Sequence, residues 1–197
     1  MRHRSRVDIV FMSDRTGARH IWRINIDGSN PRQLTSNSGE RWPRCTPDGK
    51  WVVYASIANP SGLFKVSIEG GAPVLLTNKT STYPAISPDG SVIAAGYFED
   101  KGANKTAIYS FQGGSPLEIL DFSSFYISWT PDGRSLAYID EHHVNIVSRQ
   151  MDARGSAKEL THFKEGVVVA FDWSRDGKLA CSHKVITSDA VMLTDLK

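Results

Sequence analysis

One short phrase recurs four times along this 197-residue chain at almost constant spacing. An aspartate–glycine pair returns after 41, 43 and 44 residues, and proline precedes it in three of the four copies. Self-similarity at a fixed period of this length is the signature of a repeat architecture, in which each repeat is one supersecondary unit. The residues of the phrase are Pro47, Asp48 and Gly49, then Pro88, Asp89 and Gly90, then Pro131, Asp132 and Gly133, and finally Asp176 and Gly177.

These residue types are those of a tight turn between two strands. Proline presets φ for the first turn position, glycine accepts a positive φ, and Ser, Thr and Asp side chains bond to the backbone two residues on. The other interpretation of the aspartates is a metal site or acid catalysis. Because every copy carries the aspartate in the same place, we predict that all four cap turns.

Short β-branched and aromatic runs with a period of two surround each turn, which predicts strands. One run follows the turn directly, as in 51–54, and a second comes about ten residues later, as in 63–68. A third run, such as 73–77, follows a glycine turn, and a fourth run precedes each copy of the phrase, as 126–129 precedes Pro131. Four short antiparallel strands in each repeat describe one blade of a β-propeller.

The recurring pattern of Leu-Thr, then Trp-Ser/Thr-Pro-Asp-Gly, then an apolar run resembles the TolB-like, or WD40-like (PD40), β-propeller repeat. The resemblance covers essentially the whole chain, and it implies an all-β propeller of about 4–5 four-stranded antiparallel blades. The residues three before each marker aspartate should lie on the innermost strand, wedged between blades. They are Cys45, Ile86, Trp129 and Trp173.

We expect one partial propeller over residues 1–197, with a first blade that lacks its innermost strand and a last blade that lacks its outermost one. A closed TolB-like ring would have about six blades, so we expect an incomplete or open ring whose missing N-terminal blades belong to a parent chain. A natural open arc is the alternative, and it would expose a blade face and sheet edges. The expected blades are 7–35, 36–77, 78–120, 121–161 and 162–197.

The composition argues against several classes of partner. A net charge of +2 is too small to indicate nucleic acid, and we interpret the basic residues Arg2, His3, Arg4 and Arg6 as a solubilising tail. There is no apolar run of about 18 residues, so we expect no membrane insertion. We find no signal peptide and leave the localisation open, although the resemblance favours an extracytoplasmic place. Cys45 and Cys181 lie in apolar stretches, which predicts buried thiols.

The chain contains no nucleophile elbow, zinc-protease helix or phosphate-binding glycine loop, so we predict no enzyme, no cofactor and no metal. The cluster 141–143 (Glu-His-His), which His162 could join, is expected to be a solvated loop rather than a metal site. Arg44 and Asp172 each lie four residues before a marker aspartate and are candidates to face the central channel and bind a ligand. Residues 99–105 form a candidate recognition loop.

Together these features predict a non-catalytic binding or scaffold module that engages a protein or peptide. The resemblance implies that it is a fragment of a larger bacterial signalling or extracytoplasmic protein. An alternative is the accessory gating propeller of a serine peptidase of the prolyl-oligopeptidase kind, without its catalytic domain. A further alternative is a fragment with no independent function.

Overall fold

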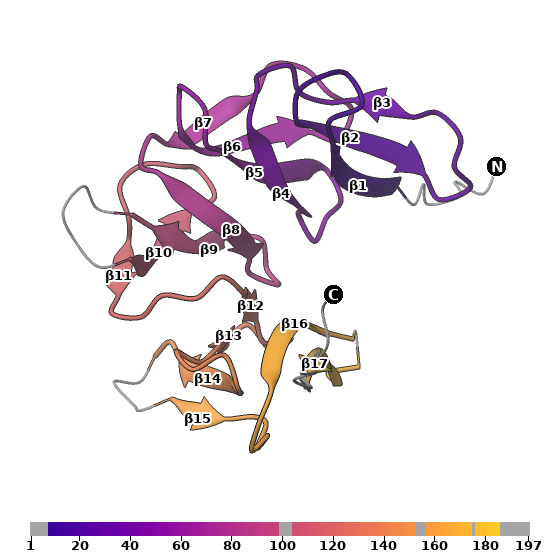
Figure 1. Cartoon of the computed structure of the whole chain (residues 1–197). Helices are drawn as coiled ribbons and strands as arrows, with labels where there is room; N and C mark the ends of the chain where they lie inside the picture. The colour runs from indigo at the N-terminus through magenta and orange to yellow at the C-terminus, as the bar shows by residue number, and fades with distance from the viewer. Residues whose placement is uncertain (1–7, 99–103, 153–156, 175, 186–197) are drawn as a thin grey trace, which may run out of the picture.

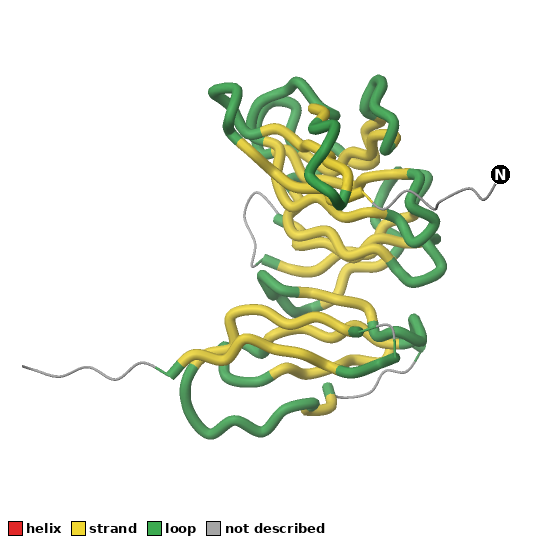
Figure 2. Tube along the Cα trace, turned by 90° about the vertical axis from the view of Figure 1, so that its right-hand side faces the viewer, coloured by secondary structure: helices red, strands yellow, loops and turns green. Residues whose placement is uncertain are grey.

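The computed structural model describes residues 8–98, 104–152, 157–174 and 176–185, and these residues form strands, turns and loops but no helix (Figure 2). The strands make five separate antiparallel sheets, each with its strands ordered along the chain. In the described part of the molecule the sheets follow one another around an arc that is open between the first and the fifth (Figure 1). The described residues therefore form an all-β propeller arrangement that is open.

The first sheet has three strands, the next three sheets have four each, and the fifth has two among the described residues. Their bounds are, for the first sheet, β1 (Asp8–Ser13), β2 (His20–Asn25) and β3 (Arg32–Gln33); for the second, β4 (Glu40–Cys45), β5 (Trp51–Ser56), β6 (Gly62–Ser67) and β7 (Val74–Thr77); for the third, β8 (Ser81–Ile86), β9 (Val92–Tyr97), β10 (Lys105–Ser110) and β11 (Glu118–Leu120); for the fourth, β12 (Ile127–Trp129), β13 (Ser135–Ile139), β14 (Ile146–Gln150) and β15 (Lys158–Glu159); and for the fifth, β16 (Val167–Trp173) and β17 (Leu179–Lys184).

The predicted grouping of short antiparallel strands in fours is confirmed for the second, third and fourth sheets. Three expectations fall outside the described residues: the basic residues 2–6, most of the loop 99–105, and the last expected strand near 190–196.

The prediction of buried thiols is wrong, because Cys45 and Cys181 are both exposed. Cys45 ends the innermost strand β4, and Cys181 lies on β17, which pairs only with β16 among the described residues. The same repeat position behaves as predicted at Trp129, which is 8% exposed and donates its indole N–H to the carbonyl oxygen of Ala85 at 3.1 Å.

In the second, third and fourth sheets the marker turn joins the innermost strand to the second strand through one set of hydrogen bonds. In the fourth sheet the Thr130 hydroxyl donates to Asp132 Oδ1 at 2.6 Å, and the backbone N–H of Arg134 donates to the same oxygen at 3.0 Å. The backbone N–H of Ser135 donates to Thr130 Oγ1 at 3.1 Å. The hydroxyl-to-aspartate bond recurs from Thr46 to Asp48, from Ser87 to Asp89 and from Ser174 to Asp176.

The hydrophobic core consists of slabs, each enclosed between two neighbouring sheets. Val52 and Tyr54 of β5 pack toward the first sheet with Ile21 and Leu34, whereas Val53 of the same strand packs toward the third sheet. Because successive side chains on a strand point to opposite faces, one strand serves two slabs. The other two slabs contain Ala94, Ile108 and Leu136, and Ala137, Ile139 and Phe171. Each sheet is therefore stabilised by its neighbours.

A buried polar network joins the first two sheets. Glu40 at the start of β4 is fully buried, and its Oε2 accepts hydrogen bonds from the Thr35 hydroxyl and, at 3.1 Å, from His20 Nδ1. Thr35 Oγ1 in turn accepts the backbone N–H of Ile21 at 2.9 Å. Burial raises the pKa of Glu40, and the hydrogen bonds from Thr35 and His20 oppose that rise. The carboxylate thus joins the edges of two sheets that also meet through apolar contacts and through the ion pair of Arg23 with Glu69, whose Nη2 and Oε2 lie 3.1 Å apart.

We predict that Glu40→Ala lowers the free energy of unfolding by about 3 kcal/mol, because it leaves His20 and Thr35 buried without their acceptor. Glu141→Ala, at a side chain that is 87% exposed, is the matched control and should change it by less than about 0.5 kcal/mol. Urea unfolding measures both values. Equal stability of the two variants would contradict a structural role for the network.

The Thr130 hydroxyl holds the pKa of Asp132 below its ordinary value. A carboxyl whose folded-state pKa is depressed stabilises the fold above its unfolded-state pKa, and this contribution is lost as the pH falls through the folded-state value. We predict that Thr130→Val raises the pKa of Asp132 toward the ordinary value, while that of Asp89, whose partner is Ser87, does not move. A carboxyl ¹³C NMR titration measures both, and an unchanged Asp132 would show that the hydroxyl does not set its pKa.

Candidate binding pocket at the inner strands

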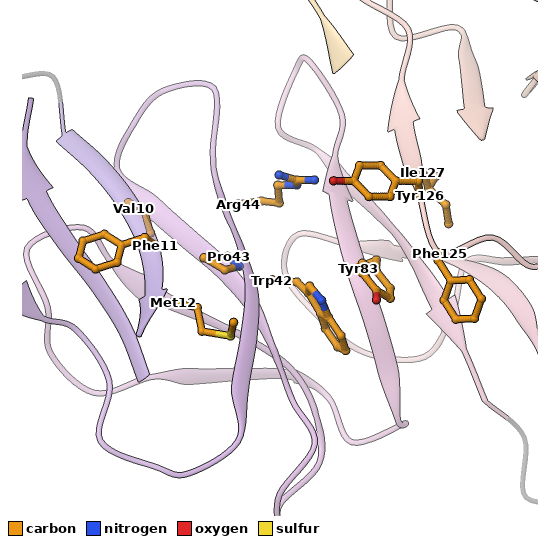
Figure 3. A pocket seen from close by; sticks show the side chains of 10 residues that line it. All are labelled: Val10, Phe11, Met12, Trp42, Pro43, Arg44, Tyr83, Phe125, Tyr126 and Ile127. Atoms are coloured by element: carbon orange, nitrogen blue, oxygen red, sulfur yellow. The ribbon is translucent and has the colours of Figure 1, made fainter. Parts of the chain in front are cut away.

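The inner strands of the second, third and fourth sheets form a pocket of about 290 Å³ together with β1 (Figure 3). Aromatic and apolar side chains dominate its wall, and one arginine accompanies them. The lining residues are Val10, Phe11, Met12, Trp42, Pro43, Arg44, Tyr83, Phe125, Tyr126 and Ile127.

Two of these aromatic residues lie at bulges in the inner strands. The pairing of β4 shifts register between Arg41 and Arg44, and Trp42 there has a φ of 53°. The pairing of β8 shifts in the same way around Tyr83, which has a φ of 50°. Left-handed backbone costs a non-glycine residue about 1–3 kcal/mol and persists only where the surrounding structure imposes it. A bulge re-aims a side chain, and here both rings turn toward the pocket.

The aromatic side chains form a row that crosses three sheets. The rings of Trp42 and Tyr83 lie 4.2 Å apart between centroids with an interplanar angle of 32°. Phe125 meets Tyr83 edge to face at 6.0 Å, and it is 55% exposed. Trp42 and Tyr83 are partly exposed, so the row offers stacking and apolar contact to a ligand.

Positive charge lies beside this row. Arg44 is exposed, and Figure 3 shows its guanidinium directed toward the hydroxyl end of Tyr126. The guanidinium of Arg41 lies 5.8 Å from the centroid of the Trp42 ring, within the range of a cation–π contact. A guanidinium pairs with carboxylates through two parallel hydrogen bonds, so this end of the pocket is suited to an acidic group.

Arg44 and Asp172, the two candidate ligand-binding residues from the sequence, line the same two neighbouring pockets of about 180 and 300 Å³. Tyr126 lines these pockets as well as the aromatic one. Asp172 comes from β16, so the inner face carries positive charge on the second sheet and negative charge on the fifth.

Sequence reasoning missed the aromatic residues, although the repeat carries a signal for them. Trp42, Tyr83 and Tyr126 each lie six residues before a marker aspartate, and Ala170 breaks the series in the fifth sheet. Proline follows Trp42 and Tyr83 directly. An aromatic residue repeated at one position of the inner strand would have indicated this surface.

The ionisable cluster at 141–143 lies in the turn between β13 and β14. His142 Nε2 is 3.6 Å from Glu141 Oε1, and both side chains are largely exposed. His162 pairs instead with Glu159 at 3.0 Å. Among the residues that the structure describes, no three His, Cys, Asp or Glu side chains are grouped as a metal ion requires. Those residues also contain no helix of the length and hydropathy needed to cross a membrane.

Solved structures share this fold. TolB from Acinetobacter baumannii aligns with a TM-score of 0.75 and 21% sequence identity over 92% of this chain and 48% of its own. A putative TolB from Agrobacterium tumefaciens aligns with a TM-score of 0.62 and 23% sequence identity over 85% of this chain and 69% of its own. Oligogalacturonate lyase from Vibrio parahaemolyticus aligns with a TM-score of 0.67 and 13% sequence identity over 90% of this chain and 55% of its own. The chain therefore has a β-propeller fold, and the propeller is TolB-like.

Sequence comparison adds a shorter match. An uncharacterised protein of Agrobacterium fabrum is 41% identical over 49 residues, which are 24% of this chain and 17% of that protein. No family model matches the chain. The chain spans about half the length of the TolB with which it aligns, and the likeness to TolB and to the lyase concerns the fold alone.

Proposed function

We propose that the chain is a non-catalytic binding module that holds a protein or peptide segment at its inner strands. The observation that carries this proposal is the Trp42–Tyr83 pair, which is presented to the pocket by two strained bulges. Backbone strain of this kind is typical of ligand-binding surfaces. The exposed ring of Phe125 extends the pair, so the surface suits an elongated ligand.

The chemistry of the pocket favours binding over catalysis. Its ten described lining residues include no histidine, carboxylate or cysteine, and so no pair that could act as nucleophile and base. A peptide segment that places an apolar or aromatic side chain on the ring row and a carboxylate on Arg44 satisfies both features of the wall. We infer a short linear segment of this kind as the ligand.

The test is a peptide display selection on the full chain, followed by calorimetric titration of the selected peptide. Trp42→Ala and Arg44→Ala should each weaken binding at least about tenfold, because each removes a central contact. Arg134→Ala, at an exposed arginine of a marker turn outside the pocket, is the matched control and should leave the affinity unchanged.

Two results would overturn the proposal. One is a selected peptide that binds the wild-type chain and both pocket variants with equal affinity. The other is a mass change in the peptide during incubation, since a binding module returns its ligand unaltered.

A further inference from the structure

The pairing registers show which residues of the first sheet correspond to those of the second. Asp8 pairs with Asn25 as Trp51 pairs with Ser67, and the match continues residue by residue along β1 and β2. Ile9 and Phe11 thus correspond to Val52 and Tyr54. Trp22 and Ile24 correspond to Phe64 and Val66.

In the second and third sheets, the side chains at these positions pack against the preceding sheet. Val52, Tyr54, Phe64 and Val66 are at most 7% exposed and pack in one slab with residues of the first sheet. The corresponding positions of the third sheet are fully buried in the slab shared with the second sheet. They are Ile93, Ala95, Ala107 and Tyr109.

In the first sheet the same positions form an apolar face that no described sheet covers. We call it the leading face; it consists of Ile9, Phe11, Trp22 and Ile24. Ile9 is 47% exposed, and the other three are partly exposed. The Arg15 guanidinium lies over this face, 5.1 Å from the Phe11 ring centroid and 4.8 Å from that of Trp22.

We propose that the leading face is a docking surface for another antiparallel β-sheet of the blade type, supplied from outside the described residues. Continuity with the existing slabs defines the chemistry of this sheet. Where the second sheet packs on the third it contributes Val53, Ala55, Leu63 and Leu76, so the docking sheet carries small and medium apolar side chains at these positions. A carboxylate on its rim would meet Arg15.

A second copy of this chain matches that description poorly. In the fifth sheet Trp173 pairs with Leu179, whereas Cys45 pairs with Val52 in the second, so the residues that correspond to Val53 and Ala55 are Ala180 and Ser182. His183 lies on the opposite face, the one that packs toward the fourth sheet, where it stacks on Phe163 at 4.0 Å and pairs with the carbonyl oxygen of Glu165 at 2.8 Å. Among the described residues, the free end of the arc therefore carries a small alanine and a polar serine where the second sheet carries the apolar Val53 and Ala55.

The test adds such a sheet to the chain. A copy of residues 36–91 joined directly before Asp8 supplies a complete blade and an inner strand for β1, because Val92 and Asp8 occupy equivalent repeat positions. We expect the melting temperature to rise by roughly 5 °C or more as four apolar side chains become buried. We also expect the fluorescence of Trp22 to shift to shorter wavelength.

In the extended chain, the double substitution Ile9→Asp with Ile24→Asp should abolish both the rise in melting temperature and the shift in Trp22 fluorescence. Leu117→Asp, at a residue directly before β11 of the third sheet that is 63% exposed and lies outside the leading face, is the matched control and should preserve them. The unextended chain provides an independent measurement: it should bind the dye ANS, and the double substitution should reduce that binding.

Three outcomes overturn the proposal. The first is an extended chain that is no more stable than the original. The second is a rise in melting temperature, or an ANS signal, that the double substitution leaves unchanged. The third is a dimer of the unextended chain that Ile9→Asp dissociates, which would make a second copy the occupant. None of these outcomes bears on peptide binding at Trp42 and Arg44.

Discussion

The structure depends on the burial of both faces of each central sheet against neighbouring sheets. No sheet of four short strands could hold a core of its own, because its side chains point alternately to opposite faces. The second sheet illustrates the arrangement, since Val52 and Val53 are both fully buried but in different slabs. Stability in such an array is approximately a sum of interfaces between nearest neighbours. The central sheets are enclosed on two sides, and the first and fifth sheets on one side among the described residues.

This constraint also explains how the pocket arises. Each marker turn fixes the end of an inner strand through a hydroxyl-to-aspartate hydrogen bond, as Thr46 and Asp48 do. The inner strand is thereby held at both ends, by its turn and, in β4, by the buried Glu40. The bulges lie between these fixed ends and bring the rings of Trp42 and Tyr83 to 4.2 Å from each other. Packing between sheets provides the rigid frame, and the inner strands carry the partly exposed residues that line the pocket.

The sequence predicted those features that the repeat enforces. A period of 41 to 44 residues and alternating strands were enough for the fold, because every copy must satisfy the same packing. Arg44 and Asp172 were predicted from their repeat position as candidates to bind a ligand; they line common cavities, and their binding role stays a prediction. The thiols of Cys45 and Cys181 were misplaced because an apolar stretch of sequence does not show which strands lack a neighbour. The Trp42 and Tyr83 bulges were missed because a left-handed aromatic residue contradicts local propensity and is imposed by tertiary structure.

Native-state hydrogen exchange of the full chain tests the central claim most directly, since it measures the opening free energy of each strand. If packing between neighbouring sheets provides most of the stability, the amides of β5, β6, β9 and β10 exchange most slowly. Protection from exchange then declines toward β1 in one direction and toward β17 in the other. Equal protection of β1 or β17 with β9 would contradict the account, because it would mean that a sheet covered on one face is held as firmly as one covered on both.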